Sequence, residues 1–112
     1  MTIFEKIARR EIPAKIEYEE EDFLAFHDVN PQAPVHVLIV PKKCIPRIGE
    51  ASEADEALLG RMLVASSRIA KQLGVDESGY RLVINHGPDA GESVPHLHIH
   101  LLGKRRMAWP PG

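Results

Sequence analysis

Hydrophobic and polar residues alternate in several short runs of this chain, and one longer run repeats at helical spacing. Residues 35–40 (VHVLIV) are the most strongly strand-forming segment, and the acidic turn at 20–22 joins two other strands into a hairpin. Between residues 58 and 73, apolar positions recur every three or four residues, which predicts an amphipathic helix of about five turns. The predicted strands are residues 15–19, 23–27, 35–40, 80–85 and 96–102.

Short signals at the ends of the helices complete this pattern. Thr2 and Glu5 have the spacing of a capping box, so a short helix is expected to begin here, ahead of Pro13. Ser52 is a suitable N-cap for the longer helix, and Gly74 stands where a left-handed C-cap is expected. The order α-β-β-β-α-β-β, with short links, predicts an α+β fold in which two helices pack on a five-stranded antiparallel sheet. The predicted apolar stripe of the longer helix is Leu58, Leu59, Met62, Leu63, Ser66, Ile69 and Leu73.

Composition narrows the class of protein. A chain of 112 residues is long enough for one domain, 1–112, of which we take 104–112 as a C-terminal tail. Its net charge of -2 argues against broad nucleic-acid binding, which usually shows as a basic surface. The chain has no apolar run long enough for a membrane span and no signal-peptide pattern, and its single cysteine, Cys44, fits a reducing compartment. We therefore expect a soluble, cytoplasmic protein that binds neither nucleic acid nor membrane.

Three histidines, His96, His98 and His100, alternate with Leu97 and Ile99. In an extended strand alternate side chains share a face, so the imidazoles are predicted to line one face while the apolar residues enter the core. Histidine readily exchanges protons or attacks an electrophile near neutral pH. Because exposed strand positions usually carry Thr, Lys, Arg or Glu, this run is more typical of a site than of a plain surface strand.

A shared metal ion is a rival interpretation of these histidines. Residues two apart on a strand are roughly 6–7 Å apart and can share an ion, but His96 and His100 are roughly 13 Å apart along a straight strand. Zn–N bonds of about 2.1 Å are too short for both to reach an ion on His98. A two-histidine site completed by His36 or His86 stays open, although the rest of the sequence offers few further ligands. We expect no metal and no other cofactor.

The segment 86–95, between the last two predicted strands, is polar and rich in glycine. Glycines such as Gly91 let a backbone approach a ligand closely, and successive N–H groups can form an anion-binding concavity. Asn85 and Ser93 add neutral hydrogen-bond donors. Beside the histidines, this loop favours an anionic electrophile such as a phosphate ester or a phosphoramidate. Alone, the same composition would suit an ordinary mobile loop.

The residues around the histidines resemble a known family. Residues 91–102 carry the pattern G-x-S-V-x-H-x-H-x-H-L-L, which is similar to the signature of the histidine triad proteins. The resemblance covers nearly the whole chain and is to the histidine triad nucleotide-binding branch, the purine nucleoside phosphoramidases. The further segments that carry it are Phe26-His27-Asp28, Pro31-Gln32-Ala33-Pro34-x-His36, Pro41-Lys42-Lys43 and Trp109-Pro110-Pro111-Gly112.

The resemblance implies a role for each histidine. His98 would attack the α-phosphorus of a nucleoside 5′-phosphoramidate, expel the amine and form a nucleotidyl-histidine intermediate that water then hydrolyses. A backbone carbonyl near His96 would hold the other ring nitrogen of the nucleophile as N–H. His100 would donate to phosphate or leaving-group oxygens, and His96 with His36 would form the supporting shell. Ser93 would hold the phosphate and help to deliver a proton to the amine.

The resemblance also implies a purine nucleotide site and a dimer. Asp28 would accept hydrogen bonds from the ribose hydroxyls, while Asn85, Gly91 and Ser93 would lie at the phosphate. The implied homodimer joins its two sheets into one and sends each C-terminal tail, with Trp109, to the partner's site. Candidates for the purine pocket are Phe4, Ile7, Phe26, Val29 and Leu38.

Three positions depart from the family pattern, and other activities stay in view. Glu92 stands where glutamine is common and is expected to point to solvent; His86 stands where an acidic residue is frequent, and Cys44 where a histidine is frequent. A dinucleoside polyphosphate hydrolase is the nearest alternative. A nucleotidyl transferase is less favoured, because that branch generally has glutamine at the position of His100. A nucleotide-binding regulatory or scaffold protein with incidental catalysis is the alternative from another class.

Overall fold

The chain folds into two helices and five strands in a computed structural model that describes residues 1–112. The elements follow one another in the predicted order, α-β-β-β-α-β-β. Short 3₁₀ turns lie at Ile48–Glu50, Glu53–Asp55 and Pro88–Ala90. The helices and strands are α1 (Ile3–Ala8), β1 (Ile16–Glu19), β2 (Phe23–His27), β3 (Val35–Pro41), α2 (Glu56–Gln72), β4 (Tyr80–Val83) and β5 (Ile99–Gly103).

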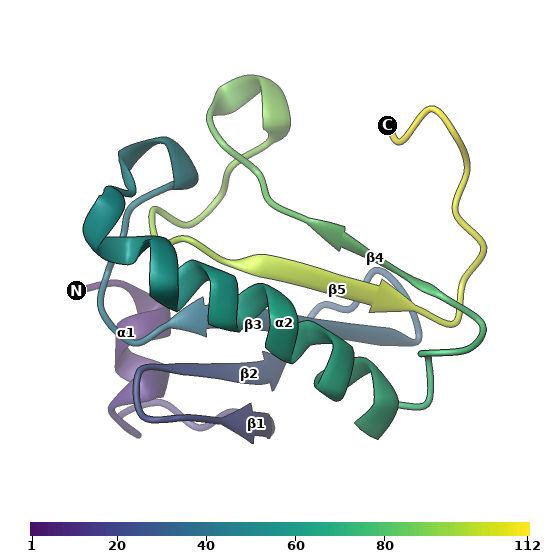
Figure 1. Cartoon of the computed structure of the whole chain (residues 1–112), viewed down its shortest axis with the longest axis horizontal. Coiled ribbons are helices and arrows are strands. Elements are labelled where there is room, and N and C mark those ends of the chain that lie inside the picture. Colours follow the sequence, from purple (N-terminus) through teal and green to yellow (C-terminus); the bar gives the residue numbers. More distant parts are fainter.

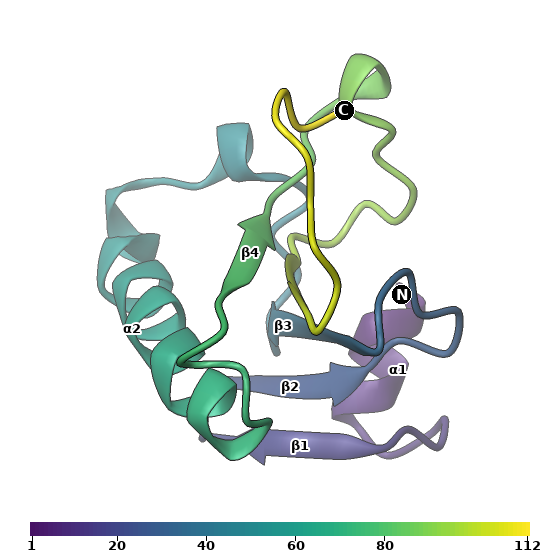
Figure 2. The same cartoon turned by 90° about the vertical axis from the view of Figure 1, so that its right-hand side faces the viewer.

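All five strands form one antiparallel sheet in the order β1-β2-β3-β5-β4. The helix α2 lies across one face of the sheet and α1 packs on the other, as Figures 1 and 2 show together. The neighbouring strands β3 and β5 come from distant parts of the chain, and Leu38 pairs with His100 while His36 pairs with Leu102. This register brings the lone histidine of β3 beside the histidine-rich segment. The predicted α+β fold is confirmed.

The face under α2 carries the larger core. Val37 and Ile39 of β3 and Ile99 and Leu101 of β5 are buried against Met62 of α2. Burial of an aliphatic side chain of this size stabilises a fold by about 1.5–3 kcal/mol. Because successive strand residues point to opposite faces, this core also turns the intervening histidine of β5 toward α1.

The opposite face carries a smaller cluster around α1. The predicted capping box is present, with the Thr2 hydroxyl accepting from the Glu5 backbone N–H and the Glu5 carboxylate accepting from the Thr2 N–H. Phe4 and Ile7 are the buried residues of this short helix, and the Phe4 ring meets that of Phe26 edge-on, with 5.5 Å between centroids. The cap and these aromatic contacts place the start of α1 beside the histidines.

Two strands differ from their predicted form. The alternation in β1 predicts that Ile16 and Tyr18 share a face, but the pairing with β2 shifts register between them, so Ile16 packs with the α1 cluster and Tyr18 with the α2 core. An extra residue in one strand of a pair reverses the alternation in this way. The last strand begins at Ile99 rather than His96, because the N–H of Leu97 donates to the carbonyl of Ile45 and leaves the ladder.

The long helix α2 ends where the sequence predicts, but it begins at Glu56 with Asp55 as its N-cap, so the N-cap predicted at Ser52 is wrong. Gly74 adopts the expected left-handed conformation, with φ of 71° just after the helix, and Ser52 precedes the 3₁₀ turn that leads into it. The predicted buried face is also corrected. Leu63, predicted to be part of the buried stripe, is 46% exposed, and its neighbour Val64 is 62% exposed. This leaves an apolar pair on the outer face of α2. None of the helices is both long enough and apolar enough to cross a membrane.

Candidate active site

The histidines meet where the start of α1 faces β3 and β5. Only His100 belongs to β5; His96 and His98 lie in the irregular segment that leads into it. The three rings nevertheless lie on the α1 side of the sheet, since Phe4 contacts the rings of His96 and His98 and the latter contacts His100. The predicted common face is therefore correct, although a regular strand accounts for only one of its members.

His96 is completely buried, and both of its ring nitrogens are hydrogen-bonded. Its Nε2 lies 2.7 Å from the carbonyl oxygen of Pro41, which can only accept, so this nitrogen carries a proton. Burial lowers the pKa of His96, which keeps the ring neutral and leaves Nδ1 as an acceptor. The hydroxyl of Thr2 donates to that Nδ1 across 2.8 Å. His96 therefore has no free ring nitrogen for proton transfer and serves as a fixed part of the site.

His98 presents the opposite arrangement, with one ring nitrogen engaged and one free. Its Nδ1 lies 2.7 Å from the carbonyl oxygen of His96, so Nδ1 carries the proton and donates it. In the neutral ring Nε2 then holds a lone pair, and this atom makes no hydrogen bond within the chain. The edge-on contact with the Phe4 ring, at 5.0 Å between centroids, limits how the imidazole can turn. The hydrogen bond to His96 thus leaves Nε2 as the ring nitrogen that can act as a nucleophile or base.

His36 fixes the tautomer of His100. The backbone N–H of Gln32 donates to Nδ1 of His36 at 3.0 Å, so the Nε2 of His36 carries its proton and donates to Nδ1 of His100 at 2.9 Å. The proton of His100 must then be on Nε2, which is buried and has no hydrogen-bond partner. Burial, with smaller contributions from the neighbouring imidazoles of His98 and His36, lowers the pKa of His100 to about 4. The ring is a neutral donor.

The two inner histidines thus offer complementary groups side by side. The ring centroids of His98 and His100 are 4.9 Å apart, with the planes at 63°. One ring has a free lone pair and the other an unpaired N–H. An unsatisfied buried donor costs about 1–3 kcal/mol, so a ligand atom that accepted from this N–H would recover that cost. This pair suits attack on an electrophile whose developing negative charge needs a hydrogen bond.

Asp28 stands next to this group at the end of β2. Its Oδ2 lies 3.5 Å from Nε2 of His36, and its Oδ1 accepts from the backbone N–H of Asn30. The carboxylate side chain is 21% exposed, so it can still bind a ligand. Val29, the next residue, is 97% exposed. A carboxylate at the rim and an apolar side chain beside it are groups that could hold a sugar and a base.

An apolar cavity of about 130 Å³ opens next to Asp28. The five side chains predicted for the purine pocket all line it, together with residues from α1 and the turn after it. Most of the lining is hydrophobic, and its polar members are His27 and Asp28. Its occupant stays a prediction. The lining residues are Ile3, Phe4, Ile7, Ile12, Pro13, Ala14, Phe26, His27, Asp28, Val29 and Leu38.

The loop between β4 and β5 is held by a charge pair that local sequence patterns do not reveal. Glu92 does not point freely to solvent: its two carboxylate oxygens accept from Nε and Nη2 of Arg47 at 2.9 and 3.0 Å, and one accepts from the Gly87 N–H at 3.0 Å. The guanidinium holds the pKa of the Glu92 carboxyl well below its usual range. The negative charge of Glu92 is therefore balanced by the guanidinium of Arg47. Asn85 and Ser93 make no side-chain hydrogen bond within the chain.

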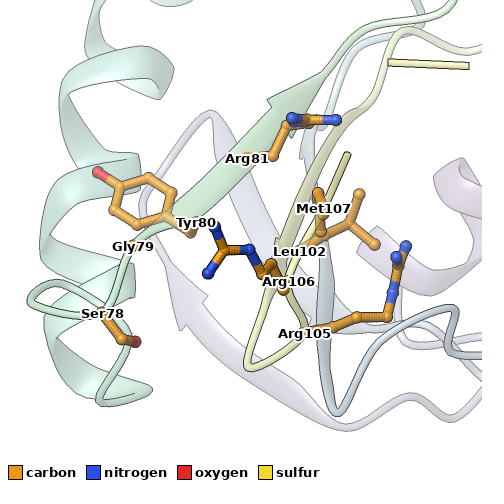
Figure 3. Close-up of a pocket in the computed structure, with 8 residues that line it drawn as sticks. All are labelled: Ser78, Gly79, Tyr80, Arg81, Leu102, Arg105, Arg106 and Met107. Carbon is orange, nitrogen blue, oxygen red and sulfur yellow. The ribbon is translucent and has the colours of Figure 1, made fainter. Parts of the chain in front are cut away.

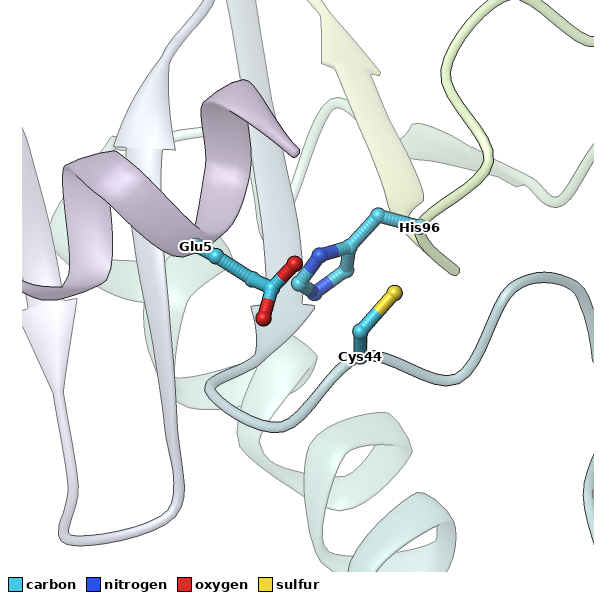
Figure 4. A group of neighbouring side chains, drawn as sticks. All are labelled: Glu5, Cys44 and His96. Atoms are coloured by element: carbon cyan, nitrogen blue, oxygen red, sulfur yellow. The ribbon is translucent and has the colours of Figure 1, made fainter. Parts of the chain in front are cut away.

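One group of side chains near α1 has the composition of metal ligands. The ligand atoms of Glu5, Cys44 and His96 lie within 4.8 Å of one another, and Figure 4 shows the His96 ring beside the carboxylate and the thiol. Both ring nitrogens already bond to Thr2 and Pro41, and burial raises the pKa of the Cys44 thiol, which disfavours the thiolate that binds metals. The group fits a metal poorly.

A second group unites Asp28, His36 and His100, again within 4.8 Å. It brings His36, one of the two histidines considered for completing a metal site, beside His100 of the triad. However, the close contact is an N–H facing a lone pair, and the other nitrogen of His36 already accepts from the backbone. His86, the other candidate, lies elsewhere and accepts the N–H of Gly49 at 3.1 Å. The hydrogen bonds present explain the geometry without an ion.

Comparison with known proteins decides the family. The HIT domain matches residues 9–107 of this chain. The chain belongs to the HIT family. An uncharacterized HIT-like protein from Synechocystis is 55% identical over 111 residues, which are 99% of this chain and 96% of that protein. The family resemblance of the triad motif is thereby confirmed.

Solved structures of HIT proteins share the fold. A HIT family hydrolase from Legionella pneumophila matches with a TM-score of 0.96 and 46% identity, and all of both chains is covered. A histidine triad nucleotide-binding protein from Candida albicans matches with a TM-score of 0.84 and 29% identity, over 100% of this chain and 85% of that one. The five-stranded sheet with two helices is therefore the HIT fold.

Proposed function

We propose that this HIT protein is a nucleotide-binding hydrolase that cleaves the P–N bond of purine nucleoside 5′-phosphoramidates. The observation that carries the proposal is the pair of opposite tautomers: His98 offers a free lone pair on Nε2, and His100 offers a buried N–H without a partner. The description of the Legionella protein as a hydrolase and of the Candida protein as nucleotide-binding supports the same class of activity.

The reaction proceeds in two displacements at phosphorus. Nε2 of His98 attacks the α-phosphorus; the bond to the amine breaks, and the amine leaves with the electron pair and takes up a proton, delivered with the help of Ser93. Water then attacks the same phosphorus, the bond to His98 breaks, and the nucleoside monophosphate is released. The N–H of His100 donates to a phosphoryl oxygen as negative charge develops there. The carbonyl of His96 stabilises the positive charge on the phosphorylated imidazole.

Recognition of the nucleotide uses the apolar cavity and its rim. The purine ring contacts Phe26 and Leu38 in the cavity and covers Val29, whose exposed side chain loses contact with water. Asp28 accepts from the ribose hydroxyls, which suits a partly exposed carboxylate. Asn85 and the backbone at Gly91 contribute donors to the phosphate. These contacts recognise the nucleotide part and leave the amine free to vary.

The decisive experiment measures amine release from adenosine 5′-phosphoramidate by the wild type, by His98→Ala and by His86→Ala as a histidine control outside the triad. We expect turnover that a chelator does not change, a loss on the order of 10³-fold or more in His98→Ala, and little change in the control. Unchanged turnover by His98→Ala would show that the nucleophile is another group. Loss of activity with chelator would favour the metal interpretation.

The alternative activities are separated by two further arms of the same assay. A dinucleoside polyphosphate offered in parallel tests the nearest alternative, and faster cleavage of that compound than of the phosphoramidate would favour it. Tight binding of adenosine monophosphate without turnover of either compound would instead favour a nucleotide-binding regulatory or scaffold protein.

A homodimer completes the proposal. The strand β4 is an edge of the sheet, and an unpaired edge invites pairing with a second copy. Figure 3 shows Tyr80 and Arg81 of β4 with Arg105 and Arg106 of the tail. These residues help to line a hollow of about 310 Å³. In the single chain the tail lies back on β4, where Arg81 donates to the carbonyl of Ala108 at 3.2 Å. Exposed apolar residues lie beside this edge and in the tail, at Tyr80, Ile84 and Trp109, and on the outer face of α2, at Leu63 and Val64.

A further inference from the structure

The hydroxyl of Thr2 makes two hydrogen bonds at once. It accepts from the backbone N–H of Glu5 at 3.1 Å, which caps α1, and it donates to Nδ1 of His96 at 2.8 Å. A hydroxyl has one proton and two lone pairs, so both bonds are satisfied by the same oxygen. The cap of the first helix and the first histidine of the triad therefore share one atom.

The direction of the second bond is fixed by the other side of the ring. Nε2 of His96 donates to the carbonyl of Pro41, so Nδ1 needs a donor, and the ring is 0% exposed to water that could supply one. Without the hydroxyl, the neutral ring has a buried acceptor that is not satisfied. It then has to turn, admit water or change its tautomer, and the last of these breaks the bond to Pro41.

A displacement of His96 reaches the proposed nucleophile directly. The carbonyl of His96 is the acceptor for Nδ1–H of His98, at 2.7 Å. Phe4, in the first turn of α1, contacts both rings, with centroids at 5.7 and 5.0 Å. The rings of His96 and His98 are thus both contacted by the same short helix that Thr2 caps.

We propose that Thr2 is a positioning residue for the reaction, which holds His96 so that its carbonyl keeps His98 in the Nδ1–H tautomer with Nε2 free. This inference rests on the function proposed above only for its kinetic consequence. The hydrogen bonds themselves concern the protein without substrate.

Three variants separate this role from simple capping of the helix. Thr2→Val keeps the shape and removes the hydroxyl. Thr2→Ser keeps both of its hydrogen bonds. Glu5→Ala is the matched control, because it removes the other half of the capping box, the bond from the Thr2 N–H to the Glu5 carboxylate, without touching the hydroxyl on His96.

The measurements are kcat and KM for adenosine 5′-phosphoramidate, the thermal unfolding midpoint, and ring-nitrogen NMR of the histidines. We expect Thr2→Val to lower kcat about tenfold or more with KM within about a factor of two, since misplaced reacting groups lose rate rather than binding. Thr2→Ser should restore kcat. Glu5→Ala should lower the unfolding midpoint less than Thr2→Val, because it leaves no buried acceptor unsatisfied on His96, and it should keep kcat.

The NMR result decides the inference independently of the substrate. In the wild type we expect a protonated Nε2 on His96 and a protonated Nδ1 on His98. The fraction of His98 with a protonated Nδ1 should fall in Thr2→Val but not in Glu5→Ala. Unchanged His98 signals in Thr2→Val, or equal kcat in Thr2→Val and Glu5→Ala, overturn the positioning role. If the wild type cleaves no phosphoramidate while the NMR shifts occur as expected, the proposed function fails and the positioning role stands.

Discussion

The Nε2–H of His36 donates to Nδ1 of His100 across 2.9 Å, and this single bond determines which nitrogen of His100 carries the proton. His36 is the donor in this bond because its other ring nitrogen, Nδ1, already accepts the backbone N–H of Gln32. A neutral imidazole thereby presents an N–H without being protonated. This matters because the pKa of His100 is lowered to about 4, so an imidazolium would be sparse at neutral pH.

Removal of the His36 donor should reduce the rate more than the binding. In His36→Leu, His100 can place its proton on either nitrogen, so we expect kcat for the phosphoramidate to fall about tenfold with little change in KM. His36→Asn, whose side-chain amide can still donate, is the matched variant and should retain more of the rate. Steady-state kinetics of both variants test this. Equal kcat for wild type and His36→Leu contradicts the tautomer argument.

The ion pair of Arg47 and Glu92 predicts that a second substitution, at Glu92, restores the KM that a first substitution, at Arg47, has raised. Arg47→Ala leaves the carboxylate of Glu92 uncompensated in the loop proposed to bind phosphate, and an added repulsion of about 1 kcal/mol corresponds to a KM about fivefold higher. Glu92→Gln should change KM little, since glutamine can still accept from the Gly87 N–H. The double variant Arg47→Ala with Glu92→Gln should therefore recover the KM of the wild type. If the double variant is as weak as Arg47→Ala, Arg47 acts by another route.

Stability should fall in mild acid because of the buried histidines. Burial lowers the pKa of His36, His96 and His100 in the folded chain, whereas the unfolded chain binds protons near pH 6.5. The unfolded state therefore binds more protons as the pH falls, and the stabilisation present above pH 6.5 is lost toward pH 4 at no more than about 1.4 kcal/mol per pH unit for each histidine.

Urea unfolding between pH 7.5 and 5.5 measures this loss above the range where carboxylates titrate. His100→Asn should reduce the slope of the unfolding free energy against pH by up to about 1.4 kcal/mol per pH unit, the slope that one proton contributes. His86→Asn, outside the cluster, should change the slope less. Parallel curves for the wild type and His100→Asn would falsify the assignment of the loss to this group.

The exposed apolar residues on the outer face of α2 can be tested as part of the interface of the proposed dimer. Val64→Lys places a charge on a residue that is 62% exposed in the single chain, so the folded monomer should keep its unfolding midpoint within a few degrees. If this face is part of the interface, sedimentation at micromolar concentration should shift from a dimer to a monomer. Glu56→Lys on the first turn of the same helix is the charge control. A wild type that sediments as a monomer rejects the dimer itself.

The sequence predicts the local features of this fold well. The capping box of Thr2 and Glu5, the left-handed Gly74 and the strand 23–27 are determined by neighbours within a few positions, and all are found in the structure. The common side of the histidines is also predicted by alternation, although only His100 lies in a regular strand. These features need no knowledge of the rest of the chain.

Features that depend on distant partners are the ones the sequence does not reveal. The register shift after Ile16 depends on pairing with β2, and the exposure of Leu63 depends on how α2 is rotated over the sheet. Glu92 is expected at the solvent because its partner, Arg47, is 45 positions away. The tautomers likewise depend on acceptors such as Pro41 that only the folded sheet brings to the rings.

Thr2 and His96 are 94 positions apart, and their hydrogen bond has a consequence for the order of folding. A contact of such long sequence separation forms only after the chain has lost the entropy of a very large loop. The sheet and α2 can assemble around their own core while α1 is still undocked. The proposed activity should then appear as the last event of folding, after the sheet and α2 have formed. Fraying of the six-residue helix α1 should abolish this activity before the rest of the protein unfolds.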